Sequence, residues 1–149
     1  MSGNYHFPGT YILILHLPEG REIQVGKLGR FTFPRGYYAY VGSAFGPGGL
    51  EGRWRHHLRK AARPHWHIDY LRAHAVIEEI WYVAGGPPRE HEWAERLRRW
   101  PESRPAAPGF GASDCRCAGH LFYFPRGRPA LEDFQTPGRG EKIGRFLLQ

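Results

Sequence analysis

Cysteine is nearly absent from the sequence: Cys115 and Cys117 are the only two among 149 residues. A single residue separates them, so they are poorly placed to form a disulfide with each other. Because disulfides persist mainly in oxidising compartments, this composition favours a cytoplasmic protein.

Long apolar segments are absent as well. The longest one, Tyr11–Leu15 with its flanks, is far shorter than the roughly 20 residues of a membrane-spanning helix. The first residues, Met1–Pro8, are polar and lack the apolar core of a signal peptide. With 41% apolar and 23% charged residues, the composition excludes a disordered chain and predicts one globular domain over residues 1–149. We expect no membrane partner.

Lysine is scarce although the chain is basic. Only Lys27, Lys60 and Lys142 are lysines among 21 cationic residues, the rest are arginines, and the formal net charge is +7. The planar fork of arginine matches phosphate oxygens, so an arginine-rich basic domain favours a polyanionic partner such as nucleic acid. A GC-rich genome, which encodes arginine where others use lysine, explains the same composition, and composition alone does not separate the two.

Apolar spacing and turn residues predict alternating strands and helices. The first 43 residues are expected to form an antiparallel meander, and a glycine-rich break precedes the first helix. The predicted strands are Tyr11–Leu17, Glu22–Val25, Phe31–Phe33, Tyr37–Val41, Val76–Val83 and His120–Phe124. Three helices are predicted: one over Leu50–Ala61, a second that begins near His65–His67, and a third that contains Trp93–Trp100. The apolar end Ile143–Leu148 is expected to dock on the body.

Five side chains are candidates for chemistry, although each has an ordinary structural interpretation. Tyr11 and Tyr40 lie in predicted strands, where most tyrosines pack in the core with a hydrated hydroxyl. Arg53 and His57 are one turn apart on a helix whose other cations suggest a solvated basic face. Glu92 would otherwise be a surface acid paired with the arginine four residues later.

Together these residues occur in an order that resembles the GIY-YIG endonuclease superfamily. The matching segments are Gly9-Thr10-Tyr11, Tyr40-Val41-Gly42-Ser43, Leu50-x-x-Arg53-x-x-x-His57 and a later helix with an acid. More narrowly, the chain resembles a small subfamily of GIY-YIG-like domains found alone or fused to endonuclease III-type glycosylases. The stretches that carry this resemblance are Tyr38–Ala44, Gly46–Leu50, His65–Leu71 and Phe110–Phe122, so the motif core covers 9–124 and residues 125–149 form a C-terminal extension.

The resemblance implies an α+β fold with a small central antiparallel sheet of about three strands flanked by helices. It also implies DNA phosphodiester cleavage that depends on Mg²⁺ or Mn²⁺. Tyr11 and Tyr40 would help to deprotonate the attacking water, and Arg53 would lower the phenol pKa and stabilise the phosphoryl oxygens. His57 would act as a general base or hydrogen-bond the phosphate. Glu92 would be the single carboxylate that binds the metal.

Two features depart from the superfamily's pattern. The segment between the tyrosine motifs, Ile12–Ala39, is long, and we expect an extra hairpin around Glu22–Phe33 to occupy it. The identity of the acid is open, because Glu90 lies two residues before Glu92 and Glu95 lies three residues after it.

A second cluster suggests zinc. Asp114-Cys115-x-Cys117-x-x-His120 offers ligands that tetrahedral zinc accepts, and His65-x-His67 could add to them. The C-x-C spacing is less typical of zinc than C-x-x-C, so zinc is an alternative to two buried thiols beside a backbone-bonded histidine.

The leading hypothesis is a GIY-YIG-type DNA endonuclease, with DNA repair as one setting. Two alternatives are a catalytically silent nucleic-acid-binding module of the same fold and a zinc-stabilised structural domain. The position of Glu92 distinguishes the first two, because a carboxylate that converges on Tyr11, Arg53 and His57 favours catalysis, whereas one that points to solvent favours binding.

Overall fold

The computed structural model describes residues 5–59, 62–112, 119–135 and 141–148. These residues form an α+β fold, as predicted from the sequence. The strands are β1 (Gly9–Leu17), β2 (Arg21–Val25), β3 (Gly29–Phe33), β4 (Gly36–Ala44), β5 (Val76–Ala84), β6 (Arg104–Pro105), β7 (Leu121–Phe124) and β8 (Gly144–Leu147). The helices are α1 (Gly49–Leu58), α2 (His67–Arg72), α3 (Glu90–Arg99) and α4 (Leu131–Phe134). In the described part of the chain, no helix has the length and apolar character of a membrane span.

The main sheet is antiparallel and has six strands in the order β6-β7-β4-β1-β5-β8. The expectation of about three strands was therefore too low, because short segments extend both edges of the central three. β6 and β7 continue the sheet beyond β4, and β8 continues it beyond β5. Strands of two to four residues become ordered by pairing with a neighbour that already exists, and their own sequences carry little signal.

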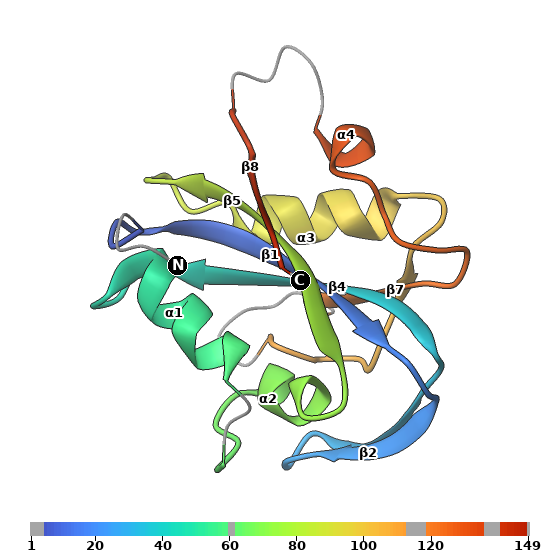
Figure 1. The fold of residues 1–149 in the computed structure, drawn as a ribbon. Helices are drawn as coiled ribbons and strands as arrows, with labels where there is room; N and C mark the ends of the chain where they lie inside the picture. The colour runs from blue at the N-terminus through green and yellow to red at the C-terminus, as the bar shows by residue number, and fades with distance from the viewer. Residues whose placement is uncertain (1–4, 60–61, 113–118, 136–140, 149) are drawn as a thin grey trace.

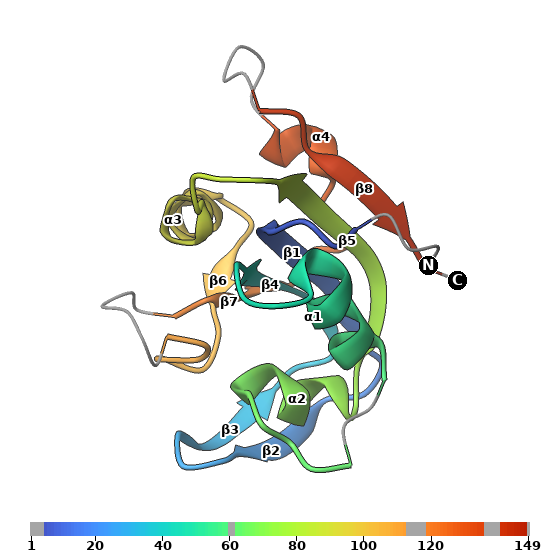
Figure 2. The same ribbon diagram turned by 90° about the vertical axis from the view of Figure 1, so that its left-hand side faces the viewer.

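The predicted extra hairpin is present, but the first part of the chain is not a simple meander. β1 pairs with β4 and not with β2, and Tyr11 lies opposite Gly42 in that register. β2 and β3 pair with each other as a separate two-stranded sheet, which lies next to α2 (Figure 2).

The central strand β1 is buried on both faces, which places a hydrophobic cluster on each side of the sheet. Tyr11, Leu13 and Leu15 belong to one cluster and Ile12 and Ile14 to the other, because successive strand residues point to opposite faces. Helices α1 and α2 cover the first face, and α3 and α4 cover the second (Figure 1).

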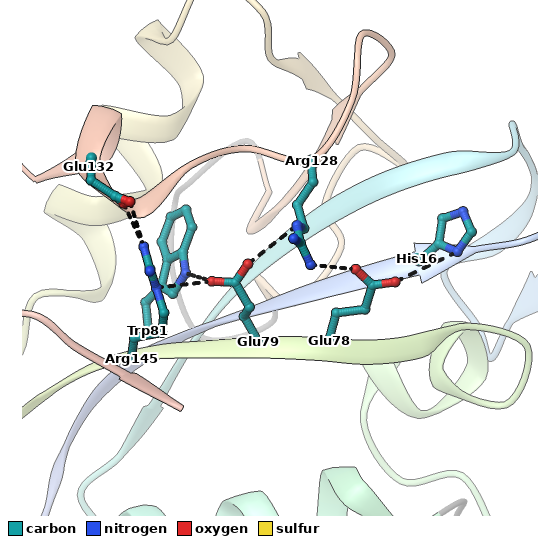
Figure 3. Close-up of polar contacts among 7 residues, drawn as sticks. All are labelled: His16, Glu78, Glu79, Trp81, Arg128, Glu132 and Arg145. Carbon is teal, nitrogen blue, oxygen red and sulfur yellow. Dashed lines mark hydrogen bonds and ion pairs between the residues drawn. The ribbon is translucent and has the colours of Figure 1, made fainter. Parts of the chain in front are cut away.

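The C-terminal extension docks on the body as a strand held by ionic contacts at the β5–β8 edge. Glu79, which is 6% exposed, accepts a hydrogen bond of 3.0 Å from Trp81 Nε1. Its carboxylate oxygens lie 3.3 Å from Arg145 Nε and 3.4 Å from Arg128 Nε (Figure 3). Glu78, the next residue on β5, pairs with Arg128 at 2.9 Å. The network ties β8 and the segment before α4 to the middle of the sheet.

Candidate active site

One pocket gathers most of the side chains that the sequence singled out. It lies where β1, β4, the middle of α1 and the start of α3 meet, on the face covered by α1. The lining residues are Tyr11, Tyr40, Gly42, Ser43, Arg53, Trp66, Glu90, Gly111 and His120.

The Tyr11 side chain lies across the neighbouring strand, and a glycine there makes this position available. A Cβ built on Gly42, the partner of Tyr11 in the β1–β4 register, would meet Tyr11 Cζ at 2.5 Å and its hydroxyl at 2.6 Å. Both distances are below any real contact, so residue 42 must lack a side chain for the ring to reach the pocket.

Tyr11 and His57 form a buried pair at the floor of this site. The distance between Tyr11 Oη and His57 Nε2 is 2.6 Å, and the His57 side chain is 1% exposed. Burial, together with the neighbouring His56, lowers the pKa of His57 to about 3, whereas burial and the neighbouring Tyr40 raise the pKa of Tyr11. Near neutral pH the pair is therefore a neutral phenol against a neutral imidazole.

Tyr40 and Arg53 complete the wall around this pair. The Tyr40 ring packs edge-on against His57 with 6.2 Å between the ring centroids. Burial and the negative charge of Glu90 raise the pKa of Tyr40, and Arg53 opposes that rise. Because Arg53 also acts to lower the pKa of Tyr11, its positive charge reaches both phenols.

Trp66 forms a platform for Arg53, whose guanidinium carbon lies 4.3 Å from the centre of the indole ring. Such stacking fixes the plane of a guanidinium at a modest energetic gain. The platform is held by Asp69, whose carboxylate accepts hydrogen bonds from the backbone amides of His65 at 2.7 Å and Trp66 at 2.9 Å. His56 Nε2 lies 2.9 Å from the same carboxylate. Burial raises the pKa of Asp69, but these contacts outweigh it and hold the pKa below its usual value.

The acid in the pocket is Glu90, and Glu92 does not line it. Glu92 is 53% exposed at its side chain and pairs with Arg96 at 2.9 Å, which is the ordinary structural interpretation of that residue. By the criterion stated above, this position of Glu92 favours the binding module over catalysis, so a catalytic metal site would need another acid. Glu90 lines the pocket with its side chain 24% exposed. Two residues on a helix point in directions roughly 200° apart, so Glu92 faces away from the pocket that Glu90 lines.

A signal for Glu90 is present in the sequence of α3. The buried residues of this helix are Trp93, Ala94 and Leu97, which lie three, four and seven positions after Glu90 and therefore on the same face. Thr10 fixes the start of the helix against β1, because its hydroxyl accepts a hydrogen bond of 3.0 Å from Arg89 N. The carboxylate of residue 90 is thereby placed beside the Tyr11 motif.

The sequence suggested His120 only as a zinc ligand, whereas the structure places it in the wall of the pocket. Its Nδ1 lies 3.1 Å from Glu90 Oε2, and its side chain is 2% exposed. The other members of the suggested zinc cluster, Asp114, Cys115 and Cys117, lie outside the described residues. His67 Nδ1 accepts a hydrogen bond of 2.8 Å from Gly111 N, and no group of three metal-ligating side chains occurs within the described ranges.

The pocket suits a divalent cation bound by few protein ligands. The Glu90 carboxylate is accessible from the pocket, and the phenols, Arg53 and backbone around it leave room for water and phosphate oxygens. Mg²⁺ and Mn²⁺ bind in this way, with one or two carboxylates and several waters.

Comparison with known proteins places the chain in a family. Residues 10–140 match the family described as "Domain of unknown function DUF123". The chain belongs to this family. No curated protein and no solved structure matches the chain. The matched span of this DUF123 domain contains every residue that lines the pocket.

Proposed function

We propose that this DUF123 domain is a metal-dependent DNA endonuclease of the GIY-YIG type. The observation that carries the proposal is the convergence of the Tyr11–His57 pair, Tyr40, Arg53 and Glu90 around one pocket. These residues come from four elements that are distant in sequence. The resemblance to the superfamily supports the same conclusion, and the β4-β1-β5 core matches the three-stranded sheet that it implies.

The Tyr11–His57 pair provides a route for the proton of the attacking water. Since the pair is neutral near pH 7, Tyr11 Oη has a proton to give and His57 Nε2 has a lone pair to receive it. As the water attacks phosphorus and the bond from phosphorus to one bridging oxygen breaks, Tyr11 takes the water's proton and passes its own to His57 across 2.6 Å. The released oxygen of the DNA strand takes a proton from solvent. Burial disfavours both the Tyr11 phenolate and the His57 imidazolium while the pocket is empty. Charge brought in by the substrate would change the balance between these forms.

Arg53 is the cation that faces the developing charge. Its guanidinium lies over Trp66 and lines the pocket, where it contacts the phosphate in both the ground state and the transition state. The cation required near the phenols is therefore part of the fold.

Glu90 is the residue that would hold the divalent ion. Its negative charge raises the pKa of both tyrosines, which opposes the loss of a proton from Tyr11 to His57. A divalent cation, when bound, supplies positive charge that reverses this effect and polarises the scissile phosphate. Metal binding at residue 90 and proton transfer at Tyr11 are thus electrostatically coupled.

The surface beside the pocket suits a polyanion. Arg55 lies on α1, where it pairs with Glu51 at 2.7 Å. Arg59 directly follows the helix and Arg63 lies beyond it, and all three arginines are largely exposed. With the net charge of +7, this surface favours DNA over a small neutral substrate.

A cleavage assay tests the proposal. The parent protein is incubated with supercoiled, branched and damaged DNA in Mg²⁺, Mn²⁺ or EDTA, and nicking is followed on gels, while binding to the same DNA is measured separately. We expect nicking that requires a divalent metal and is lost in Tyr11→Phe and Arg53→Ala. DNA binding without cleavage in any divalent metal would favour the silent binding module, and absence of both would refute each nucleic-acid function.

A further inference from the structure

His120 is held in place at the pocket by backbone hydrogen bonds, although it lies just before β7 and outside any helix or strand. Its backbone amide donates a hydrogen bond of 2.7 Å to Phe110 O, and its carbonyl accepts one of 3.0 Å from Val41 N. The residue is therefore attached to β4 directly beside Tyr40. Its side chain is almost fully buried, so the imidazole has little freedom to leave the wall of the pocket.

The distance between His120 Nδ1 and Glu90 Oε2, 3.1 Å, is a close polar contact and also suits two ligands of one metal ion. Ligand bonds of roughly 2.1 Å that meet at a right angle place their two donor atoms about 3.0 Å apart. The two side chains need little movement to change from one arrangement to the other. Within the described residues no third histidine, cysteine or carboxylate joins them.

We propose that Glu90 and His120 bind one divalent ion together, and that the imidazole makes this site select a first-row transition ion such as Mn²⁺ over Mg²⁺. The proposal deepens the proposed function, because Glu90 is the metal ligand of that function. A carboxylate alone suits Mg²⁺, which takes oxygen ligands and keeps its waters. A nitrogen donor adds affinity for transition ions and little for Mg²⁺.

The test measures metal binding without DNA. Mn²⁺ affinity is obtained from the loss of the free-ion EPR signal, Mg²⁺ affinity from competition, and the ligands of bound Mn²⁺ from pulsed EPR. We expect the parent to show nitrogen coupling from one imidazole and to prefer Mn²⁺ to Mg²⁺ by about tenfold or more. His120→Ala and His120→Asn should lose the coupling and most of that preference, whereas Glu90→Ala should lose both metals.

His91→Ala is the matched control, because His91 is an exposed residue of α3 beside Glu90 whose ring centroid lies 6.1 Å from that of His120. It should keep both the coupling and the preference. Affinity alone does not decide the question, since losing a side chain that only orients a ligand costs about 10- to 100-fold as well. Equal loss of Mn²⁺ and Mg²⁺ affinity in His120→Ala would assign His120 a positioning role and overturn the proposal.

Two results on the parent protein overturn the proposal regardless of how the variants fold: no Mn²⁺ binding, or Mn²⁺ bound without nitrogen coupling. Coupling that is lost in a folded His91→Ala overturns it as well. The cleavage assay separates this failure from that of the proposed function. A parent that binds Mn²⁺ through nitrogen but cleaves no DNA keeps the shared metal site and loses the nuclease. A parent that cleaves with Mg²⁺ and shows no nitrogen coupling keeps the nuclease and loses the shared metal site.

Discussion

The buried imidazole of His57 should make the domain lose stability as the pH falls below the ordinary pKa of histidine. The folded-state pKa is lowered from 6.5 to about 3, so the unfolded chain binds the proton more tightly. Stability is complete above pH 6.5 and declines as the pH falls toward 3. Linkage gives a slope of up to about 1.4 kcal/mol per pH unit, and a loss of about 2 kcal/mol between pH 6.5 and about pH 4.5.

Urea unfolding across this pH range measures the effect as a difference between variants. His57→Gln removes the titrating group, so its free energy of unfolding should fall less steeply with decreasing pH than that of the parent. His91→Gln, which alters an exposed histidine, should retain the parent's slope. If the parent and His57→Gln lose stability in parallel, His57 is not held neutral and the proton route through Tyr11 is refuted.

Three further predictions concern the geometry, the substrate and the C-terminal extension. Gly42→Ala should reduce metal-dependent nicking at least tenfold with DNA affinity retained, because the new Cβ would lie only 2.5 Å from Tyr11 Cζ and the ring would have to move. Unchanged nicking would contradict the placement of that ring. DNA affinity should fall steeply with salt, and Arg59→Ala should reduce the slope of log affinity against log salt by about one; a salt-independent affinity would exclude a phosphate-binding surface. Glu79→Ala should lower the free energy of unfolding by about 2 kcal/mol, since it leaves Trp81 Nε1 without its acceptor and removes the buried carboxylate that Arg128 and Arg145 share. The matched variant Glu78→Ala, at a more exposed position, should cost less than about 1 kcal/mol, and equal losses would show that the network adds nothing.

The parts of the fold that the sequence predicted are those with a strong local pattern. β1 contains a continuous apolar run, Tyr11–Leu15, and the glycine-rich break before α1 marks the start of that helix. β6 and β8 could not be predicted because their order comes from pairing with β7 and β5. The pairing of β1 with β4, across an inserted hairpin, is likewise a tertiary choice that no local pattern contains.

The candidate site shows the same division. The order of Tyr11, Tyr40, Arg53 and His57 along the chain was enough to suggest that they meet, and the structure places them together. Glu92 lies outside the pocket and Glu90 lines it, because the rotation of α3 about its axis is set by how its apolar face packs. His120 contacts Glu90 although the two residues are 30 positions apart in the sequence, and no local pattern of the sequence indicates this contact.

The most direct test of the central claim compares the two acids of α3. Nicking of supercoiled DNA in Mg²⁺ and in Mn²⁺ is measured for the parent, Glu90→Ala and Glu92→Ala, with DNA binding recorded for each. We expect Glu90→Ala to abolish nicking, because the metal ligand has gone, and to bind DNA as well as the parent or better, because a negative charge near the phosphate has gone. Glu92→Ala should nick like the parent, since its carboxylate pairs with Arg96 on the surface. Loss of nicking in Glu92→Ala with full activity in Glu90→Ala would contradict the assigned site, and normal nicking by both variants would exclude a metal held at either residue.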